Sequence, residues 1–355
     1  ELPDVRAAAT ADPRGFLAAH PPPVIYDEVQ NAPDLLPYVK EHVDTHRQIR
    51  GQFLLSGSQN LLLLELVTES LAGRAAILRL LPLSQREALG EPGAVLPWEV
   101  GSGARCAGPT HGDLWRAFLR GSYPELVAEP ARDWALWHSS YLQTYLERDV
   151  RSIRQVGDLT LFQAFLRMLA ARSGQLLNLT DVARDLGVAV NTARAWLSVL
   201  EATFQVAIVR PYFANVGKRL VKTPKVYFTD VGMLCHLAGL RAPEHASAGP
   251  MAGPILETAV FGEIYRTLTH RGTMPQIHFW RTASGAEVDF VIETEGTLVP
   301  VEVKLSATPR PAMADNIRAF RSDLGKKAAP GHVVHPGEVR LPLGPGAASL
   351  PFAEL

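Results

Sequence analysis

The sequence predicts an α/β protein of two or three domains. At 355 residues the chain is longer than a single ordinary hydrophobic core accommodates. Short apolar runs at 24–26 and 53–55 flank a helical segment at 32–45, and this strand–helix–strand order predicts a right-handed crossover in a sheet buried on both faces. Residues 286–293 and 299–305 alternate apolar and polar side chains, as β-strands do.

Composition favours a folded, cytoplasmic protein. Hydrophobic residues make up 47% and charged residues 20% of the chain. The formal net charge of −1 provides no global attraction for nucleic acid, so such binding would need a local basic patch. Cys106 and Cys235 cannot build a disulfide framework and indicate reduced thiols. The most apolar run, 61–67, is interrupted by Glu65 and is too short to cross a bilayer, so no membrane association is expected. Because the chain does not begin with methionine and has no signal peptide, we expect a fragment or a processed form.

The first predicted domain, residues 1–90, contains half of a nucleotide site. Asp12-Pro13 is a typical helix start. The strand at 24–26 ends in Asp27 and Glu28, and ligands of open α/β sheets bind at the carboxyl ends of strands. There Asp27 would hold Mg²⁺ and Glu28 would orient or deprotonate the attacking water, although an acidic strand end can also simply cap the next loop.

Several stretches of this domain resemble the bacterial and archaeal AAA-like P-loop ATPases. Residues 24–28 resemble their Walker B strand, and 54–59 (Leu-Leu-Ser-Gly-Ser-Gln) resemble their sensor strand. Residues 69–74 and the Pro-Leu-Ser-x-x-Glu run at 82–87 also recur. The resemblance implies that Ser58 or Gln59 senses the γ-phosphate. It also implies that Arg74 contacts phosphate, the alternative being an exposed helix residue.

The phosphate-binding loop of that family is absent from this chain. No Gly-x-x-x-x-Gly-Lys-Ser/Thr run occurs, although this loop supplies the backbone N–H cradle, the phosphate-binding lysine and a Mg²⁺ ligand. In the family the loop precedes the Walker B strand. We therefore expect the full-length protein to be an ATPase, and this chain to bind ATP weakly or not at all.

A Gly- and Pro-rich linker at 91–110 precedes a helical and winged-helix region at 111–225. A cap at Thr180, a short helix at 181–186 and a stop at Gly187 predict the first helix of a helix-turn-helix. Asn191 would cap the second helix, 192–203, and a strand at 206–209 with a basic hairpin at 215–226 would form the wing. The residues expected to contact nucleic acid are Arg194, Lys218, Arg219, Lys222 and Lys225. A winged helix that serves as a structural lid is the alternative. Residues 141–151 and 215–230 again resemble the ATPase family.

The third predicted domain, residues 226–335, carries the most specific chemistry. Glu257 lies near the start of a predicted helix at 255–268, Asp289 lies on the strand at 286–293, and Glu302 and Lys304 share one face of the strand at 299–305. Adjacent strands would bring these groups together. Asp289 and Glu302 would bind Mg²⁺, and Lys304 would position or activate water for phosphodiester cleavage.

This arrangement resembles the PD-(D/E)XK restriction-endonuclease-like superfamily. Its Asp and Glu-x-Lys fall at Asp289 and at 302–304, thirteen residues apart, and its helical acid falls at Glu257. The resemblance implies a truncated ATPase coupled to a Mg²⁺-dependent nuclease that acts on DNA, with a homo-oligomer as a further expectation. The alternative is a nucleotide-controlled scaffold that binds DNA or protein through an inactive nuclease fold. Residues 336–355 are rich in Pro and Gly and are predicted to form a tail.

Overall fold

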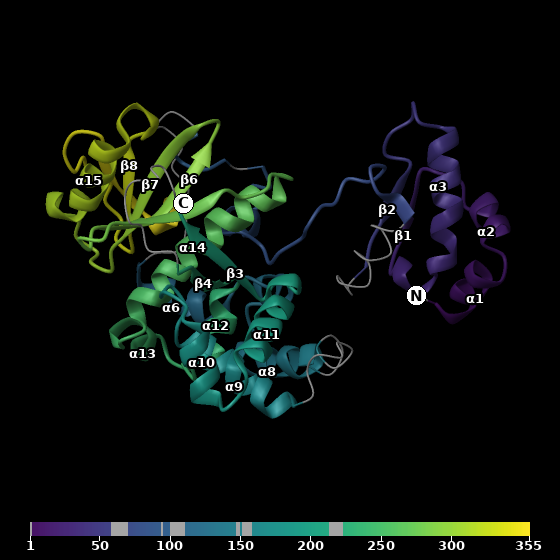
Figure 1. Cartoon of the computed structure of the whole chain (residues 1–355), viewed down its shortest axis with the longest axis horizontal. Coiled ribbons are helices and arrows are strands. Elements are labelled where there is room, and N and C mark those ends of the chain that lie inside the picture. The colour runs from purple at the N-terminus through teal and green to yellow at the C-terminus, as the bar shows by residue number, and fades with distance from the viewer. Residues whose placement is uncertain are drawn as a thin grey trace. The chain divides into compact units, whose positions relative to one another are not determined.

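The computed structural model describes residues 2–57, 70–93, 95–99, 111–146, 150, 158–212 and 223–355. These fall into two compact units, residues 1–77 and residues 78–355 (Figure 1). No helix of the described ranges is long and apolar enough to cross a bilayer.

The N-terminal unit is a small α/β structure around two parallel strands, β1 (Val24–Tyr26) and β2 (Phe53–Leu55). Its helices are α1 (Pro3–Ala11), α2 (Pro13–Ala19) and α3 (Leu36–Thr45), with the 3₁₀ turns η1 (Val29–Asn31) and η2 (Pro33–Leu35) before α3. The predicted start of α2 is confirmed, because the Asp12 carboxylate accepts a hydrogen bond from the Gly15 N–H at 2.9 Å.

Burial of β1 on both faces, which the apolar run predicted, is not observed. Tyr26 is buried in a core with Val29 and Leu36, but Ile25 is 67% exposed. Its register partner Leu54 is 56% exposed. In the described part of this unit, one face of the two-stranded sheet is therefore covered and the other is open.

The C-terminal unit is built around a mixed seven-stranded sheet in the order β4-β3-β5-β6-β7-β8-β9. Its strands are β3 (Val206–Pro211), β4 (Lys225–Phe228), β5 (Ile277–Arg281), β6 (Glu287–Thr294), β7 (Thr297–Val303), β8 (Gly331–His335) and β9 (Ala347–Pro351). Strands β5, β6 and β7 are antiparallel neighbours, whereas β7, β8 and β9 run parallel.

Two helices cover opposite faces of this sheet, α14 (Ala252–His270) and α15 (Asp315–Leu324). Phe290 of β6 packs in the same core as Phe261 of α14, whereas the next residue, Val291, packs with Phe320 of α15. Consecutive side chains of a strand point to opposite faces, so this pairing follows from the pleat. The predicted helix at 255–268 and the predicted strand at 286–293 are confirmed within a few residues at their ends.

The remaining helices lie mostly beside the β3–β4 end of the sheet (Figure 1). They are α5 (Gln85–Ala88), α6 (His111–Arg120), α7 (Pro124–Ala128), α8 (Trp134–Tyr145), α9 (Leu159–Ala170), α10 (Leu179–Leu186), α11 (Val190–Ala202), α12 (Val231–Leu237) and α13 (Pro243–Ala248). Short 3₁₀ turns complete the described fold: η4 (Pro311–Ala314), η5 (Gly325–Lys327) and η6 (Phe352–Glu354).

The two helices predicted to form a helix-turn-helix are present as α10 and α11, but their caps differ from the prediction. Asn178, not Thr180, caps α10 with hydrogen bonds to the next turn, and Gly187 ends it at φ 69° as expected. The N-cap position of α11 is Ala189, and Asn191 lies inside the helix. Each predicted start was therefore about two residues late.

Three predicted boundaries are not followed by the structure. Strands β3 and β4 belong to the same sheet as β5–β9, so no division falls at residue 225. The predicted tail at 336–355 contributes β9, and Leu355 is only 2% exposed. The run at 82–87, assigned above to the ATPase domain, forms α5 of the C-terminal unit, where the Gln85 N–H donates to Glu263 of α14 at 2.7 Å.

Candidate functional site

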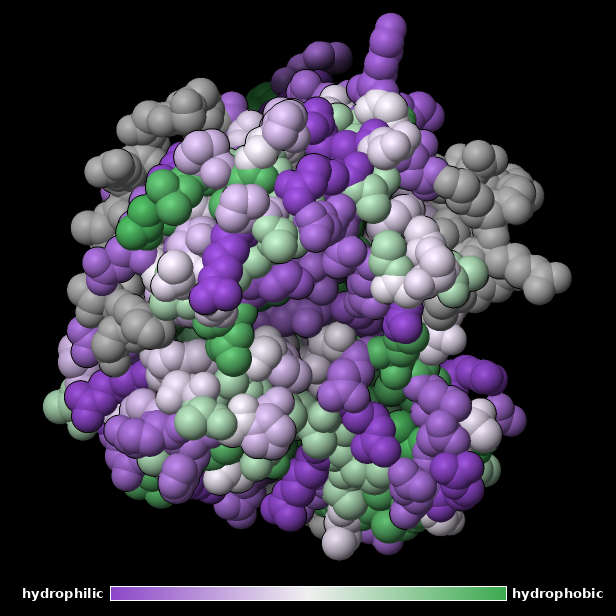
Figure 2. Space-filling view, turned by 90° about the vertical axis from the view of Figure 1, so that its left-hand side faces the viewer, coloured by the Kyte–Doolittle hydropathy of each residue, from purple (hydrophilic) through white to green (hydrophobic). Residues whose placement is uncertain are grey.

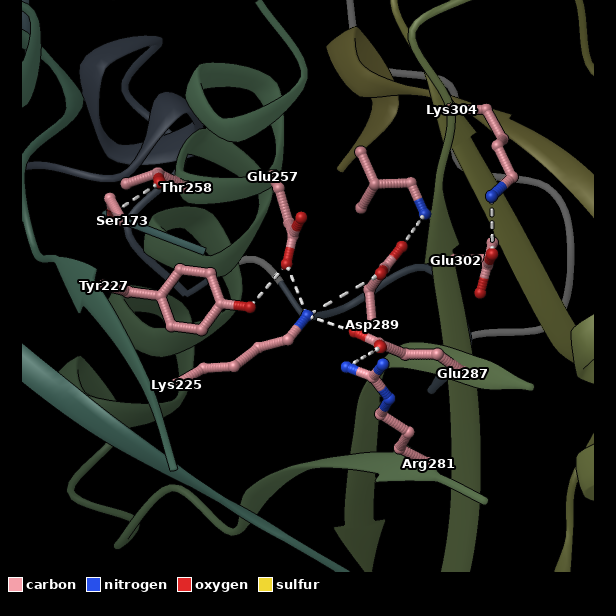
Figure 3. A network of polar contacts seen from close by, with 11 residues as sticks. Ser173, Lys225, Tyr227, Glu257, Thr258, Arg281, Glu287, Asp289, Glu302 and Lys304 are labelled. Carbon is pink, nitrogen blue, oxygen red and sulfur yellow. Dashed lines mark hydrogen bonds and ion pairs between the residues drawn. The ribbon is translucent and has the colours of Figure 1, made fainter. Parts of the chain in front are cut away.

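A cluster of charged side chains lies where β4, α14, β6 and β7 meet (Figure 3). Strand β4 provides Lys225 and Tyr227, and α14 provides Glu257. Strand β6 provides Glu287 and Asp289, while β7 provides Glu302 and leads into Lys304. The members of this acidic cluster, as it is called below, are Lys225, Tyr227, Glu257, Glu287, Asp289, Glu302 and Lys304.

Asp289 and Glu302 are brought together by the antiparallel register of β6 and β7. Phe290 pairs with Val301, so the preceding residue of one strand lies beside the following residue of the other. The Val303 N–H donates to Asp289 Oδ2 at 2.7 Å and fixes that carboxylate at the end of the ladder. The predicted juxtaposition of Asp289 with the Glu-x-Lys segment is therefore present.

Glu302 is almost fully buried, with a side chain only 2% exposed. Its Oε1 accepts hydrogen bonds from Lys304 Nζ at 2.6 Å and from Asn316 Nδ2 at 3.1 Å. Its Oε2 is buried and has no hydrogen-bond partner among the described residues. A buried carboxylate oxygen without a partner is costly, and this oxygen is therefore suited to a ligand that brings positive charge. Lys304 is the more accessible member, with a side chain 36% exposed. Strand β7 ends at Val303, two residues before the predicted end at 305, and Leu305 is 43% exposed.

Lys225 lies at the opposite side of Asp289. Its ammonium group is 2.6 Å from Glu287 Oε1, 3.1 Å from Glu257 Oε1 and 4.0 Å from Asp289 Oδ1. The Lys225 side chain is only 4% exposed. The predicted position of Lys225 on a basic wing is therefore wrong: it lies in β4, facing the partly buried carboxylates of Glu257, Glu287 and Asp289.

Glu257 is held from two sides. The Tyr227 hydroxyl donates to Glu257 Oε1 at 2.5 Å, and the Lys225 ammonium donates to the same oxygen. Residues 225 and 227 point to the same face of β4 because side chains alternate along a strand. That alternation was the available sequence signal for Lys225 and Tyr227, and Glu287 shares the same alternation with Asp289 on β6.

The acidic cluster has more acidic than basic side chains, with four carboxyl groups and two lysines, and the pKa values of several of these groups are shifted. Burial, with the charge of Asp289, raises the pKa of Glu257 to about 7, against the opposing effect of Lys225. Burial and the charge of Asp289 likewise raise the pKa of Glu302 to about 7. Burial raises the pKa of Asp289 as well, although Lys225 and the Val303 N–H oppose it. Burial would lower the pKa of Lys225, but the charges of Glu257, Asp289 and Glu287 outweigh it and raise that pKa.

The donor set fits a magnesium ion held by two carboxylates. Mg²⁺ is typically bound by one or two carboxylates and keeps several waters, so a closed protein cage is not required. Asp289 and Glu302 offer this pair, and the unpartnered Glu302 Oε2 is the observation that favours it. No group of three His, Cys, Asp or Glu side chains arranged to hold a metal occurs in the described ranges. The Lys225 ammonium lies among Glu257, Glu287 and Asp289.

The predicted nucleotide residues of the N-terminal unit lie at the end of β1. Asp27 Oδ1 accepts a hydrogen bond from Ser56 Oγ at 2.5 Å, so the ends of β1 and β2 are linked. Glu28 has a left-handed backbone at φ 52° and accepts a hydrogen bond from Gln30. Both acids line a cavity of about 800 Å³ between β1 and the first two helices. Ser58 and Gln59 lie outside the described residues.

Arg74 is engaged by a carboxylate of its own unit. Its Nε and Nη2 donate to the two oxygens of Asp44 at 2.8 and 2.9 Å. The hydrogen bond from Arg74 lowers the pKa of Asp44. Contact of Arg74 with phosphate, as the resemblance implied, would require this bidentate pair to open.

The nucleic-acid residues are only partly described. Arg194 lies exposed on α11, where Nη1 donates to Asn191 at 3.2 Å. Lys218, Arg219 and Lys222 lie outside the described residues.

The face of the molecule drawn in Figure 2 is mainly hydrophilic and is hollowed across its middle, where the deepest atoms are also hydrophilic.

Comparison with known proteins divides the chain into three consecutive parts. An AAA domain matches residues 1–89, a domain of unknown function (DUF8612) matches 111–244, and a second domain of unknown function (DUF4143) matches 252–355. Uncharacterized proteins of Mycobacterium bovis and Mycobacterium tuberculosis are each 32% identical over 353 residues, which is 99% of this chain and 73% of each relative. No solved structure matches the chain significantly.

Proposed function

Because the chain belongs to the same family as these uncharacterized mycobacterial proteins and matches an AAA domain over residues 1–89, we propose that its C-terminal unit hydrolyses phosphodiester bonds under the control of a nucleotide. The AAA domain indicates ATPase-like activity, which is typically Mg²⁺-dependent. The phosphodiester activity is supported by one observation above all. Asp289 and Glu302 meet at neighbouring strands, with the Lys304 ammonium 2.6 Å from Glu302.

Each residue has a role that its position allows. Asp289 and Glu302 would hold a magnesium ion, which when bound lowers the pKa of water and offsets negative charge on the phosphate. Lys304, the most exposed of the three, would orient the attacking water and the phosphate. Glu257 is ionisable near neutral pH and stands on the other side of Asp289, where it would accept a proton.

The proposed reaction is the hydrolysis of a nucleic-acid phosphodiester, with DNA as the substrate. The water oxygen forms a bond to phosphorus, and the bond between phosphorus and the leaving sugar oxygen breaks. The water proton passes to a base of the site or to solvent, and the leaving oxygen takes up a proton. No redox partner or second substrate is required.

The N-terminal unit would supply the control. Asp27 and Glu28 line the same cavity, which suits a Mg²⁺–nucleotide complex with the attacking water near Glu28. The segment at 82–87 would carry the control, because it joins the end of the AAA match to α14, the helix that bears Glu257.

The test is a cleavage assay on plasmid, branched and single-stranded DNA with Mg²⁺ or Mn²⁺, on this chain and on the full-length protein with ATP. We expect cleavage that Lys304→Ala reduces by at least about a hundredfold, the range typical of lost acid–base or charge stabilisation. Lys327→Ala is the matched control, because Lys327 is an exposed lysine of the same unit. No cleavage by the full-length protein under any of these conditions would refute the proposal.

A second candidate follows from the neutralising position of Lys225. With two of the acids paired to a lysine, the C-terminal unit would instead be a nucleotide-controlled scaffold that binds DNA or protein. Salt-sensitive binding that survives Lys304→Ala, without cleavage, would favour the scaffold over the nuclease.

A further inference from the structure

The acidic cluster contains four carboxylates and two lysines, and the two lysines contact different carboxylates. Lys304 contacts Glu302 from the exposed side, at 2.6 Å. Lys225 contacts Glu257 and Glu287 from the interior, and its ammonium is 4.0 Å from Asp289. Asp289 therefore stands between two positions that attract positive charge. One faces Glu302, and the other is filled by the Lys225 ammonium (Figure 3).

Other contacts, besides the ion pairs with Glu257 and Glu287, hold the Lys225 ammonium in position. It lies over the ring of Phe279, 5.5 Å from the ring centre, which is a favourable cation–π contact. Tyr227, on the same face of β4, donates to the Glu257 oxygen that also receives Lys225. Glu287, the closest partner of Lys225, is held from its other oxygen by Arg281 at 3.3 Å.

A divalent cation cannot share this position with the ammonium. Any metal bound by Glu257, Glu287 and Asp289 would stand within a few ångströms of a buried positive charge, where repulsion is weakly screened. On the Glu302 side of Asp289, the Lys304 ammonium contacts Glu302 Oε1, but its side chain is 36% exposed, and Glu302 Oε2 has no partner among the described residues.

We infer that the Lys225 ammonium takes the place of a second divalent cation, so that the C-terminal site binds one metal ion, at Asp289 and Glu302. This inference rests on the proposed function for the first metal only. It makes Lys225 the residue that determines the metal stoichiometry of the site. It also assigns Glu287, which no sequence motif marked, as the carboxylate that holds Lys225 there.

The experiment counts bound Mn²⁺ by electron paramagnetic resonance titration without nucleotide. Asp27→Asn is present in every sample, so that its carboxylate in the N-terminal unit does not enter the count. We expect one tightly bound ion in the parent and two in Lys225→Met, because the substitution keeps the length of the side chain and removes the ammonium that Glu257, Glu287 and Asp289 share. Lys327→Met controls for the change in net charge, and Glu302→Gln should remove the ion of the parent.

The outcomes separate this inference from the proposed function. One ion in both the parent and Lys225→Met would overturn the inference and leave the proposed function standing. No ion in the parent would refute the proposed function and also the ion at Asp289 and Glu302 that the inference takes from it, whatever Lys225→Met binds. Two ions in the parent would overturn the inference directly.

A further variant keeps the inference testable if Lys225→Met does not fold. Glu287→Gln alters the support of Lys225 without touching the pair that holds the metal. We expect its Mn²⁺ affinity to stay within about threefold of the parent, whereas a loss beyond about tenfold, the size typical for a partner of a metal site, would count against the inference.

Discussion

The backbone N–H of Val303 donates a 2.7 Å hydrogen bond to Oδ2 of Asp289, so the residue between Glu302 and Lys304 holds the carboxylate of the neighbouring strand. This single bond joins the two halves of the predicted Asp and Glu-x-Lys pattern. The other oxygen, Asp289 Oδ1, lies 4.0 Å from the Lys225 ammonium.

Asp289→Asn tests that arrangement. The asparagine carbonyl can still accept from Val303, so the fold should persist while the charge is lost. We expect Mn²⁺ affinity to fall by at least about tenfold, with the free energy of unfolding unchanged or increased, because a buried charge is removed. Calorimetric titration and chemical unfolding measure the two quantities. Unchanged metal affinity would show that Asp289 is not a ligand.

The raised pKa values of the cluster predict a pH-dependent stability. The folded pKa of Glu302 is about 7, above its ordinary 4.5, so between these values the folded chain binds more protons than the unfolded one. The contribution of Glu302 to stability is therefore present below pH 4.5 and is lost as pH rises towards 7. Burial lowers the pKa of His332 and of His236 to about 4. Between pH 4 and 6.5 these two histidines bind fewer protons in the folded chain than in the unfolded one, so their effect is to increase stability as pH rises.

The variant Glu302→Gln separates the effect of Glu302 on the pH dependence of stability from that of the histidines, because it removes only the titration of the Glu302 carboxyl group. We expect the stability of the parent relative to this variant to fall as pH rises from 4.5 to 7, and Mg²⁺ to restore part of it at pH 8. Urea unfolding at several pH values, with and without Mg²⁺, measures this. A difference that does not change with pH would show that Glu302 titrates normally in the folded chain.

The buried pair of Glu263 and Arg266 supports α14 and is expected to be sensitive to single substitutions. Arg266 is 2% exposed, pairs with Glu263 and donates to the Thr229 carbonyl at 2.8 Å. Arg266→Met leaves Glu263 buried with only the Gln85 N–H, so we expect a loss of about 3–5 kcal/mol. The double variant with Glu263→Met should lose less than the sum of the single variants, and strict additivity in a denaturation cycle would contradict the pairing.

A close approach of two backbones predicts intolerance at Gly232. A Cβ at this position would lie 2.6 Å from the Cα and 2.7 Å from the N of Gly121, which are backbone atoms. We expect Gly232→Ala to cost about 1–3 kcal/mol through overpacking. Gly253, in α14, has open space around its missing side chain, so Gly253→Ala should be neutral or stabilising by up to about 1 kcal/mol. Thermal unfolding of both variants measures these changes in stability. Equal changes in the two variants would contradict the close approach of the backbones at Gly232.

The C-terminal residues are predicted to be integral to the fold. Phe352 is 4% exposed, and its ring packs edge-on against that of Phe118, with 5.1 Å between the ring centres. The backbone carbonyl of Phe352 accepts a hydrogen bond from the Gln85 side chain. Phe352→Ala should therefore cost about 3–5 kcal/mol. Leu341→Ala, at a residue 42% exposed, should change stability by less than about 0.5 kcal/mol. If Phe352→Ala were as mild as Leu341→Ala, the segment would be a tail after all.

The sequence by itself determined the local elements and the residues of the Asp289–Lys304 motif. A short apolar run located β1. The alternation of apolar and polar side chains located β6 and β7, because it is a local property of strands. It also placed Asp289 beside Glu302, since two consecutive antiparallel strands have a register constrained by their short connection.

Only the tertiary structure decided what surrounds that motif. Lys225 is more than thirty residues from Glu257 and more than sixty from Asp289, so no local pattern could show that β4 lies where its lysine meets their carboxylates. The same holds for the segment at 82–87 against α14 and for β9 at the edge of the sheet. Each depends on contacts between distant segments, where burial and charge pairing of the whole unit, not the preference of a short stretch, determine the position of a side chain.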